Sequence, residues 1–145
     1  MLKAWKASRD RRGLAALEFC IAAPMLVTVL VGVMDLGRAI DQTIRLETAA
    51  RDGAQYALSF PDDLAGIRNS VSTALNGQAG LRTPQVTMAC ECPSAGGGVP
   101  AADPGCTSPC SGRQRLLTIV AQQDFNATLL KNVKVLTGNV TLRIE

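Results

Sequence analysis

The sequence predicts an α+β protein: a long N-terminal helix, half of it transmembrane, continues into a small domain with one further helix packed on a 3–4-stranded antiparallel sheet. Three observations support this class. An apolar run near the N-terminus is long enough to span a bilayer, the helical pattern continues beyond it, and segments rich in β-forming residues follow. The chain has 145 residues, which gives room for a membrane segment and one small domain.

The apolar run covers residues 14–34 and reads LAALEFCIAAPMLVTVLVGVM, with Glu18 as its only charged residue. A helix of this length rises about 30 Å, the thickness of a hydrocarbon core. Residues 1–13 carry five Lys or Arg and one Asp. By the positive-inside bias, this basic N-terminal segment is expected in the cytoplasm and the C-terminal part is expected to be exported. Pro24 is expected to kink the transmembrane helix.

The helical pattern continues through residues 35–58, which contain no proline. Acid–base pairs four residues apart, such as Asp41 with Arg45, favour a helix with a water-exposed face. Apolar or small residues recur at helical spacing: Leu36, Ile40, Ile44, Ala50, Ala54 and Ala57. A face of small residues allows close approach either of another helix or of the protein's own sheet, and we favour the sheet. This face consists of Ala49, Ala50, Gly53, Ala54 and Ala57.

Residues 59–145 are expected to form a small periplasmic α+β domain. Residues 61–77 have proline and acids at the start and glycine at the end, which is typical of a helix. Strands are predicted over residues 85–92 and 115–125, and residues 133–145 offer one bent or two short strands. The intervening segment PSAGGGVPAADPGCTSPCSGR, rich in Gly, Pro and Ser, is expected to be an irregular loop.

Four of the five cysteines, Cys90, Cys92, Cys106 and Cys110, lie in this domain. A small domain in an oxidising compartment favours two disulfides over a metal site. Three connectivities are possible, and the nested pairing of Cys90 with Cys110 and Cys92 with Cys106 is geometrically the simplest. Cys20, within the apolar run, is interpreted as a small apolar residue.

Composition argues against several functions. The net charge of +3 consists of +4 in residues 1–13 and −1 in the remainder, so the exported part lacks the positive surface that nucleic acid binding needs. The chain has no histidine, which excludes Ser-His and Cys-His nucleophile pairs. The adjacent acids Asp62 and Asp63 are interpreted as helix-capping residues, not as a catalytic pair. We therefore expect no enzymatic activity, no cofactor and no metal.

The N-terminal segment resembles the TadE-like family of pilus-assembly pseudopilins. The resemblance rests on RRGLAALEF, on Pro24, on GVMDLGRA and on AARDGAQYA, which match the family's RG-x₄-EF start, membrane proline and two later segments. Gln55 departs from the arginine that is frequent at its position, which puts in doubt any contact that needs a cation there.

The resemblance implies that a membrane-embedded prepilin peptidase cuts between Gly13 and Leu14 on the cytoplasmic side. It also implies that Glu18 and Phe19 act in assembly, with Glu18 meeting an N-terminal amine of a neighbouring subunit. A snorkelling acid at the membrane interface is the simpler alternative for Glu18. The implied partners are the inner membrane, the peptidase, other Tad pseudopilins, the major Flp pilin and the pilus assembly platform.

Two other functions remain open from the residues alone. One is a signal-anchored periplasmic binding or scaffold protein unrelated to pili, which leaves Glu18 without a role. The other is a secreted enzyme, which the missing histidine disfavours. Within the pilus interpretation, the chain either enters the fibre, primes its assembly or stays at the platform.

Overall fold

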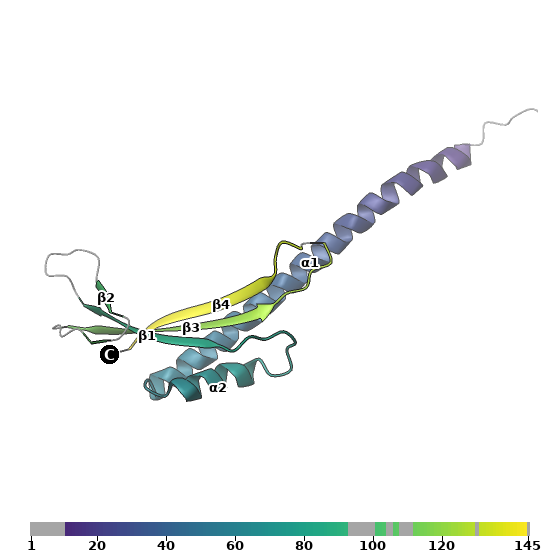
Figure 1. Cartoon of the computed structure of the whole chain (residues 1–145). Coiled ribbons are helices and arrows are strands. Elements are labelled where there is room, and N and C mark those ends of the chain that lie inside the picture. The colour runs from purple at the N-terminus through teal and green to yellow at the C-terminus, as the bar shows by residue number, and fades with distance from the viewer. Residues whose placement is uncertain (1–10, 93–100, 104–105, 108–111, 130, 145) are drawn as a thin grey trace, which may run out of the picture.

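The computed structural model describes residues 11–92, 101–103, 106–107, 112–129 and 131–144. Its elements are α1 (Arg11–Ser59), α2 (Leu64–Ala74), β1 (Gln85–Cys92), β2 (Ala101–Asp103), β3 (Gln114–Asp124) and β4 (Val135–Ile144). The strands form one antiparallel sheet in the order β2-β1-β3-β4 (Figure 1). The predicted α+β class, with a long apolar helix, one further helix and an antiparallel sheet, is confirmed.

Helix α1 is a single helix of 49 residues that contains both the apolar run and its continuation. Pro61 follows its end and disfavours helical backbone at the preceding residue. Figure 1 shows that the N-terminal half of α1 projects away from the rest of the molecule, whereas the C-terminal half lies along the sheet and α2. One uninterrupted helix thus provides both an exposed N-terminal half and a C-terminal half that packs in the domain.

Strand β3 lies in the middle of the sheet. It pairs with β1 from Gln114 to Val120 and with β4 from Arg115 to Asp124. Strand β4 is one uninterrupted strand, so of the two predictions for the C-terminal segment the single strand holds. The β-branched and leucine residues of β3 alternate between buried and half-buried positions, as expected for a strand with one face on a core.

The short strand β2 corrects the prediction of an irregular loop after residue 92. Its three residues pair with the end of β1, with Cys90 opposite Asp103 and Cys92 opposite Ala101. Ala and Asp have low β-propensity and prolines flank the segment, so the local sequence does not predict a strand here. The pairing is held in place by the neighbouring disulfide instead of by propensity.

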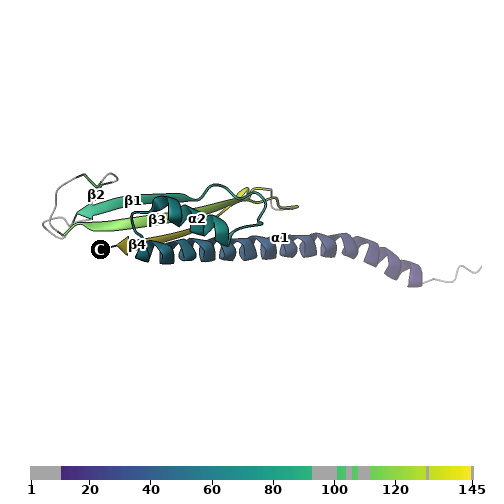
Figure 2. The ribbon, with the colours of Figure 1, turned by 90° about the horizontal axis from the view of Figure 1, so that it is seen from below.

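The hydrophobic core lies between the sheet and the two helices (Figure 2). Helix α1 contributes Leu46 and its small residues, α2 contributes Ile67 and Val71, and the sheet contributes residues such as Leu117 and Ile119, all of them buried. The small-residue face is buried in the protein's own core, where Ala49, Ala50, Gly53 and Ala57 are buried and Ala54 packs against the same cluster. The favoured packing on the sheet holds only in part, because Gly53 lies against Val71 of α2 as well as Ile119 of β3.

Two glycines permit the closest approaches in this core. A Cβ at Gly53 of α1 would lie 2.4 Å from Cγ2 of Val71, so the missing side chain lets α2 pack directly on α1. A Cβ at Gly138 of β4 would lie 2.5 Å from backbone atoms of Leu46 and Glu47. Strand β4 can therefore rest on the α1 backbone only because residue 138 has no side chain.

Candidate assembly site

The predicted processing site lies at the start of α1. Gly13 and Leu14 are both within the helix, and Gly13 is exposed with no atom within 4 Å of the place where its Cβ would be. The first turn has no acidic residue to favour the helix dipole, and glycine weakens a helix by about 1 kcal/mol relative to alanine. This first turn is therefore weakly stabilised.

Glu18 and Phe19 lie one to two turns further along, and both are exposed on the isolated half of α1. Phe19 is 71% exposed, and the apolar residues that follow are exposed to a similar degree, including Met25 at 71%. None of the most apolar 18-residue window of α1 is buried in the part of the chain that the structure describes. Apolar side chains that face outward around a whole helix match a lipid environment. Among the described residues, this is the one helix long and apolar enough to cross a membrane.

Pro24 lies inside this half of the helix. It has no amide hydrogen, so the carbonyl of Cys20 has no helical donor one turn later. The Thr28 hydroxyl donates a hydrogen bond of 2.8 Å to the carbonyl of Pro24. Figure 2 shows that the purple N-terminal part of α1, which contains Pro24, bends away from the axis of the remainder. A bend in this part of the helix is what Pro24 predicts.

Asp35 joins the helix to the end of the sheet. Its side chain is buried, at 2% exposure, directly after the apolar run. The backbone N–H of Leu129, in the loop between β3 and β4, donates a hydrogen bond of 2.7 Å to Oδ2 of Asp35. The Leu129 side chain also lies beside Gly32, which precedes Asp35 by about one helical turn. A Cβ on Gly32 would be 3.6 Å from Cδ2 of Leu129. A buried carboxylate needs such donors, and hydrogen bonds to a charged acceptor are stronger than neutral ones.

Sequence reasoning treated Asp35 only as part of a family-like segment and missed this contact. The available signal was a single acid placed immediately after the apolar run. The sequence does not distinguish a solvent-exposed carboxylate at this position from a buried carboxylate that accepts a hydrogen bond. Only the fold brings residues 35 and 129 together.

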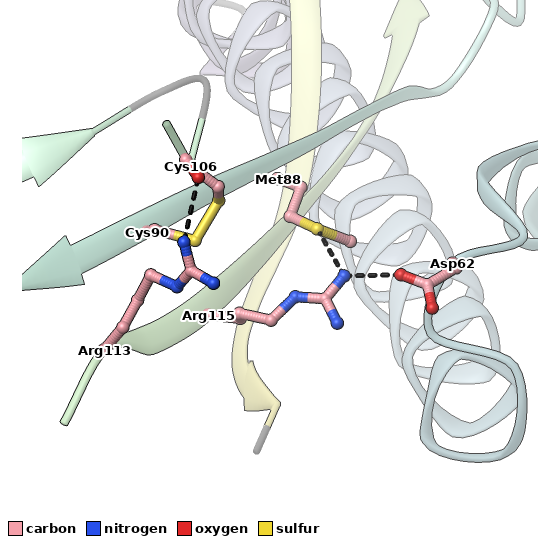
Figure 3. Close-up of a disulfide and its surroundings, with 6 residues drawn as sticks. All are labelled: Asp62, Met88, Cys90, Cys106, Arg113 and Arg115. Atoms are coloured by element: carbon pink, nitrogen blue, oxygen red, sulfur yellow. Dashed lines mark hydrogen bonds and ion pairs between the residues drawn. A yellow bond between two sulfur atoms is a disulfide. The ribbon is translucent and has the colours of Figure 1, made fainter. Parts of the chain in front are cut away.

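The cysteines form the second predicted site, at the far end of the sheet (Figure 3). Cys90 is bonded to Cys106, so the nested pairing with Cys110 is wrong for Cys90. Cys92 is disulfide-bonded as well, and Cys110 lies outside the described residues. The nested arrangement fails because β2 folds back beside β1 and puts Asp103 opposite Cys90, which brings Cys106 next to Cys90. Cys20 is a free, exposed cysteine on the membrane half of α1.

Two arginines surround this disulfide. Arg113 Nη1 donates a hydrogen bond of 2.9 Å to the carbonyl of Cys106. Arg115 of β3 forms an ion pair with Asp62 and donates to Sδ of Met88 at 3.0 Å (Figure 3). Arg115 therefore connects the central strand to the turn between the two helices, and Asp62 has a structural partner.

Asp63 caps α2, as the sequence predicts. Its Oδ1 accepts a hydrogen bond of 2.9 Å from the Gly66 N–H, and its Oδ2 accepts one of 3.0 Å from the Tyr56 hydroxyl. The Gly66 N–H first, and then the Tyr56 hydroxyl, hold the pKa of Asp63 below its usual value. The same hydrogen bond to Asp63 raises the pKa of Tyr56. This pair fixes the angle at which α2 leaves α1.

Among the described residues, no group of three or more Cys, Asp or Glu side chains is arranged to hold a metal ion. The conspicuous features of the described residues are an exposed apolar helix, the hydrogen bond between Asp35 and Leu129 at its end, and a disulfide-bonded domain.

Comparison with known families agrees with this description. Residues 13–55 match the family model described as TadE-like protein, which is less than a third of the chain. The match begins at Gly13, continues through Glu18, Pro24 and Asp35, and ends within the buried small-residue face of α1. No curated protein and no solved structure matches the chain. The predicted family resemblance is confirmed for this segment: residues 13–55 are a TadE-like segment, which makes up most of α1.

Proposed function

We propose that this chain is a non-enzymatic minor pseudopilin that acts in the assembly of a tight-adherence (Tad) pilus. The TadE-like match suggests involvement in Tad pilus assembly. The observation that supports the proposal most directly is that the matched segment begins as an exposed apolar helix and continues into a packed domain. We place residues 1–13 in the cytoplasm, residues 14–34 in the inner membrane, and residues 35–58 and 59–145 in the periplasm. The basic leader and the positive-inside bias support this orientation.

In this proposal, a prepilin peptidase cuts the bond between Gly13 and Leu14. A protease cleft binds extended backbone, so the first turn of α1 must open before cleavage. The first N–H groups of a helix have no partners within the helix, and glycine at position 13 weakens this turn further. The geometry thus supports cleavage at the end of the helix without disturbance of the domain.

Cleavage creates an α-ammonium group on Leu14. Glu18 lies four residues away, about 6 Å along the helix axis, and its exposed carboxylate is available to a neighbouring chain. A charged residue costs about 2.5–3.5 kcal/mol at the centre of a membrane helix and less near its end, where Glu18 lies, so a cationic partner stabilises it. The α-ammonium of an adjacent subunit supplies such a partner, and Phe19 adds an exposed apolar surface beside it.

Mass spectrometry of the mature N-terminus tests processing. In cells with the cognate peptidase, the chain should begin at Leu14, and Gly13→Leu should leave the full-length chain. A full-length wild-type chain in such cells contradicts the proposal.

Glu18→Ala and Glu18→Gln test assembly separately. Both variants should be cleaved normally, while pili are lost in each, because neither side chain offers a carboxylate. Asp52→Asn is the matched control, since it removes an exposed acid from the same helix outside the membrane. Normal pili with Glu18→Gln would refute the assembly role of the charge.

A further inference from the structure

The loop between β3 and β4, residues 125–134, lies where the membrane half of α1 meets the domain. Figure 1 shows this loop beside the middle of α1 and distant from the disulfide end of the sheet. The Phe125 N–H donates a hydrogen bond of 2.9 Å to the Lys134 carbonyl and closes the base of the loop, while the Phe125 ring is buried in the core. The loop is therefore a firmly attached part of the domain.

The loop reaches past the end of the domain toward the apolar run. Its Leu129 N–H is bonded to Asp35, the first residue after the run, and its Leu129 side chain lies beside Gly32, inside the run. Three helical residues correspond to about 4.5 Å along the axis. An apolar run of 21 residues matches the hydrocarbon thickness, so Gly32 lies at the outer edge of the hydrocarbon core. The side chain of Leu129 therefore reaches the depth of the membrane interface.

The exposed residues of this loop match that position. Leu129 is 50% exposed and Val133 is 39% exposed, although each is apolar. Lys131 and Lys134 lie between and beside them, are exposed, and line one open depression together with Ala127 and Val133. Apolar residues interleaved with lysines are the composition of segments that lie in the interface, with aliphatic groups in the lipid and ammonium groups at the phosphates.

We propose that this loop is a second membrane contact of the chain and binds the anionic phospholipid surface on the side of the membrane that carries the domain. Leu129 and Val133 enter the interface, and Lys131 and Lys134 pair with lipid phosphates. Each lysine near an anionic surface strengthens such binding about fivefold. The domain is then held at the bilayer by two points, α1 and this loop, and cannot swing freely about the helix. The inference depends on the membrane anchor and not on any role in pili.

Depth-dependent quenching of a single tryptophan tests the contact in the full chain. Trp5 is the only tryptophan, so Trp5→Phe gives a background in which one reporter is added at a time. Leu129→Trp and Val133→Trp place it in the loop. Leu58→Trp is the matched control, because Leu58 is an exposed leucine near the end of α1, about 35 Å beyond Asp35 along the helix. Val27→Trp reports the anchor itself.

In bilayers of brominated phosphatidylcholine and phosphatidylglycerol, both loop tryptophans should lose most of their emission, whereas the Leu58→Trp emission should be unaffected. Lys131→Gln with Lys134→Gln should weaken the loop quenching in these bilayers but not in pure phosphatidylcholine. Quenching at Val27→Trp with none at either loop position would overturn the proposal while the anchor stands. A loop tryptophan with blue-shifted but unquenched emission would show that protein covers the loop, and would also overturn it.

Discussion

Replacement of Gly138 by alanine should separate the sheet from α1. The new Cβ would lie 2.5 Å from the Leu46 carbonyl carbon and from the Glu47 nitrogen, and 2.8 Å from Cβ of Leu46. Ordinary contact begins at 3.4 Å, so β4 or α1 has to move by about 0.9 Å. The atoms in the way are mainly helix backbone, which cannot rotate aside as a flexible side chain does. The strand also pairs Gly138 with buried Ala121, which opposes movement from the other side.

The cost follows from these contacts. Extra methyl groups in a packed core destabilise by about 1–3 kcal/mol, and alanine in place of glycine returns about 0.5–1 kcal/mol through the unfolded chain. At the middle of these ranges, we therefore expect Gly138→Ala to destabilise the domain by about 1.2 kcal/mol, which corresponds to about an eightfold loss of hydrogen-exchange protection.

Hydrogen exchange with the full chain in lipid nanodiscs measures this effect at the slowest amides of β3 and β4. Gly37→Ala is the control, because Gly37 lies in α1 and has no atom within 4 Å of its potential Cβ. That substitution should leave the sheet protection unchanged and strengthen the local helix by up to about 1 kcal/mol. Equal sheet protection in Gly138→Ala and wild type would refute the reasoning from close approach.

Three further outcomes can be measured by hydrogen exchange with the same full-length preparation. Gly53→Ala should destabilise the domain, and addition of Val71→Ala should recover part of the loss through a coupling energy of about 1 kcal/mol or more; additive effects would contradict the clash. Asp35→Ala should speed exchange at Leu129 by more than Asp35→Asn, which keeps an acceptor oxygen; equal rates in both variants would argue against the hydrogen bond. Asp63 has a lowered folded-state pKa, so its contribution is present above the unfolded value of 3.8 and is lost as the pH falls below it. Protection of α2 should therefore fall in acid in wild type, and should vary less with pH in Asp63→Asn; identical pH profiles would be the contrary result.

The elements that sequence reasoning located correctly are those with a local physical signal. The absence of proline between residues 25 and 60 predicts that the helix continues, and β-branched runs predict β1, β3 and β4 to within about two residues. The small-residue face of α1 could be assigned to the domain because close packing needs short side chains.

The remainder depends on contacts between distant segments. Leu36, Ile40 and Ile44 have the spacing of a buried stripe, yet they are 53%, 53% and 57% exposed. The helix carries two periodic faces: Leu46 and the small residues meet the domain, whereas Leu36, Ile40 and Ile44 lie on the exposed face. Similarly, a disulfide pairing among four cysteines depends on where β2 docks, and the residues of β2 give no sign that they form a strand.

Because α1 is a single helix, the number of residues between Glu18 and the domain affects the direction in which Glu18 faces around the helix axis. Each residue of a straight helix turns it by about 100°, so eighteen residues complete five turns, and apart from the bend in the part that contains Pro24, Glu18 and Leu36 lie on the same side of α1. Buried Leu46 lies about 80° away around the helix, so the side of α1 that carries Glu18 continues into exposed Leu36 and not into the face that meets the sheet. Deletion of a single residue between them would turn the acid by about 100° relative to the domain, while every side chain in the core kept its place. The number of residues from Glu18 to the domain, together with the bend in the part that contains Pro24, thus sets the direction in which the acid faces.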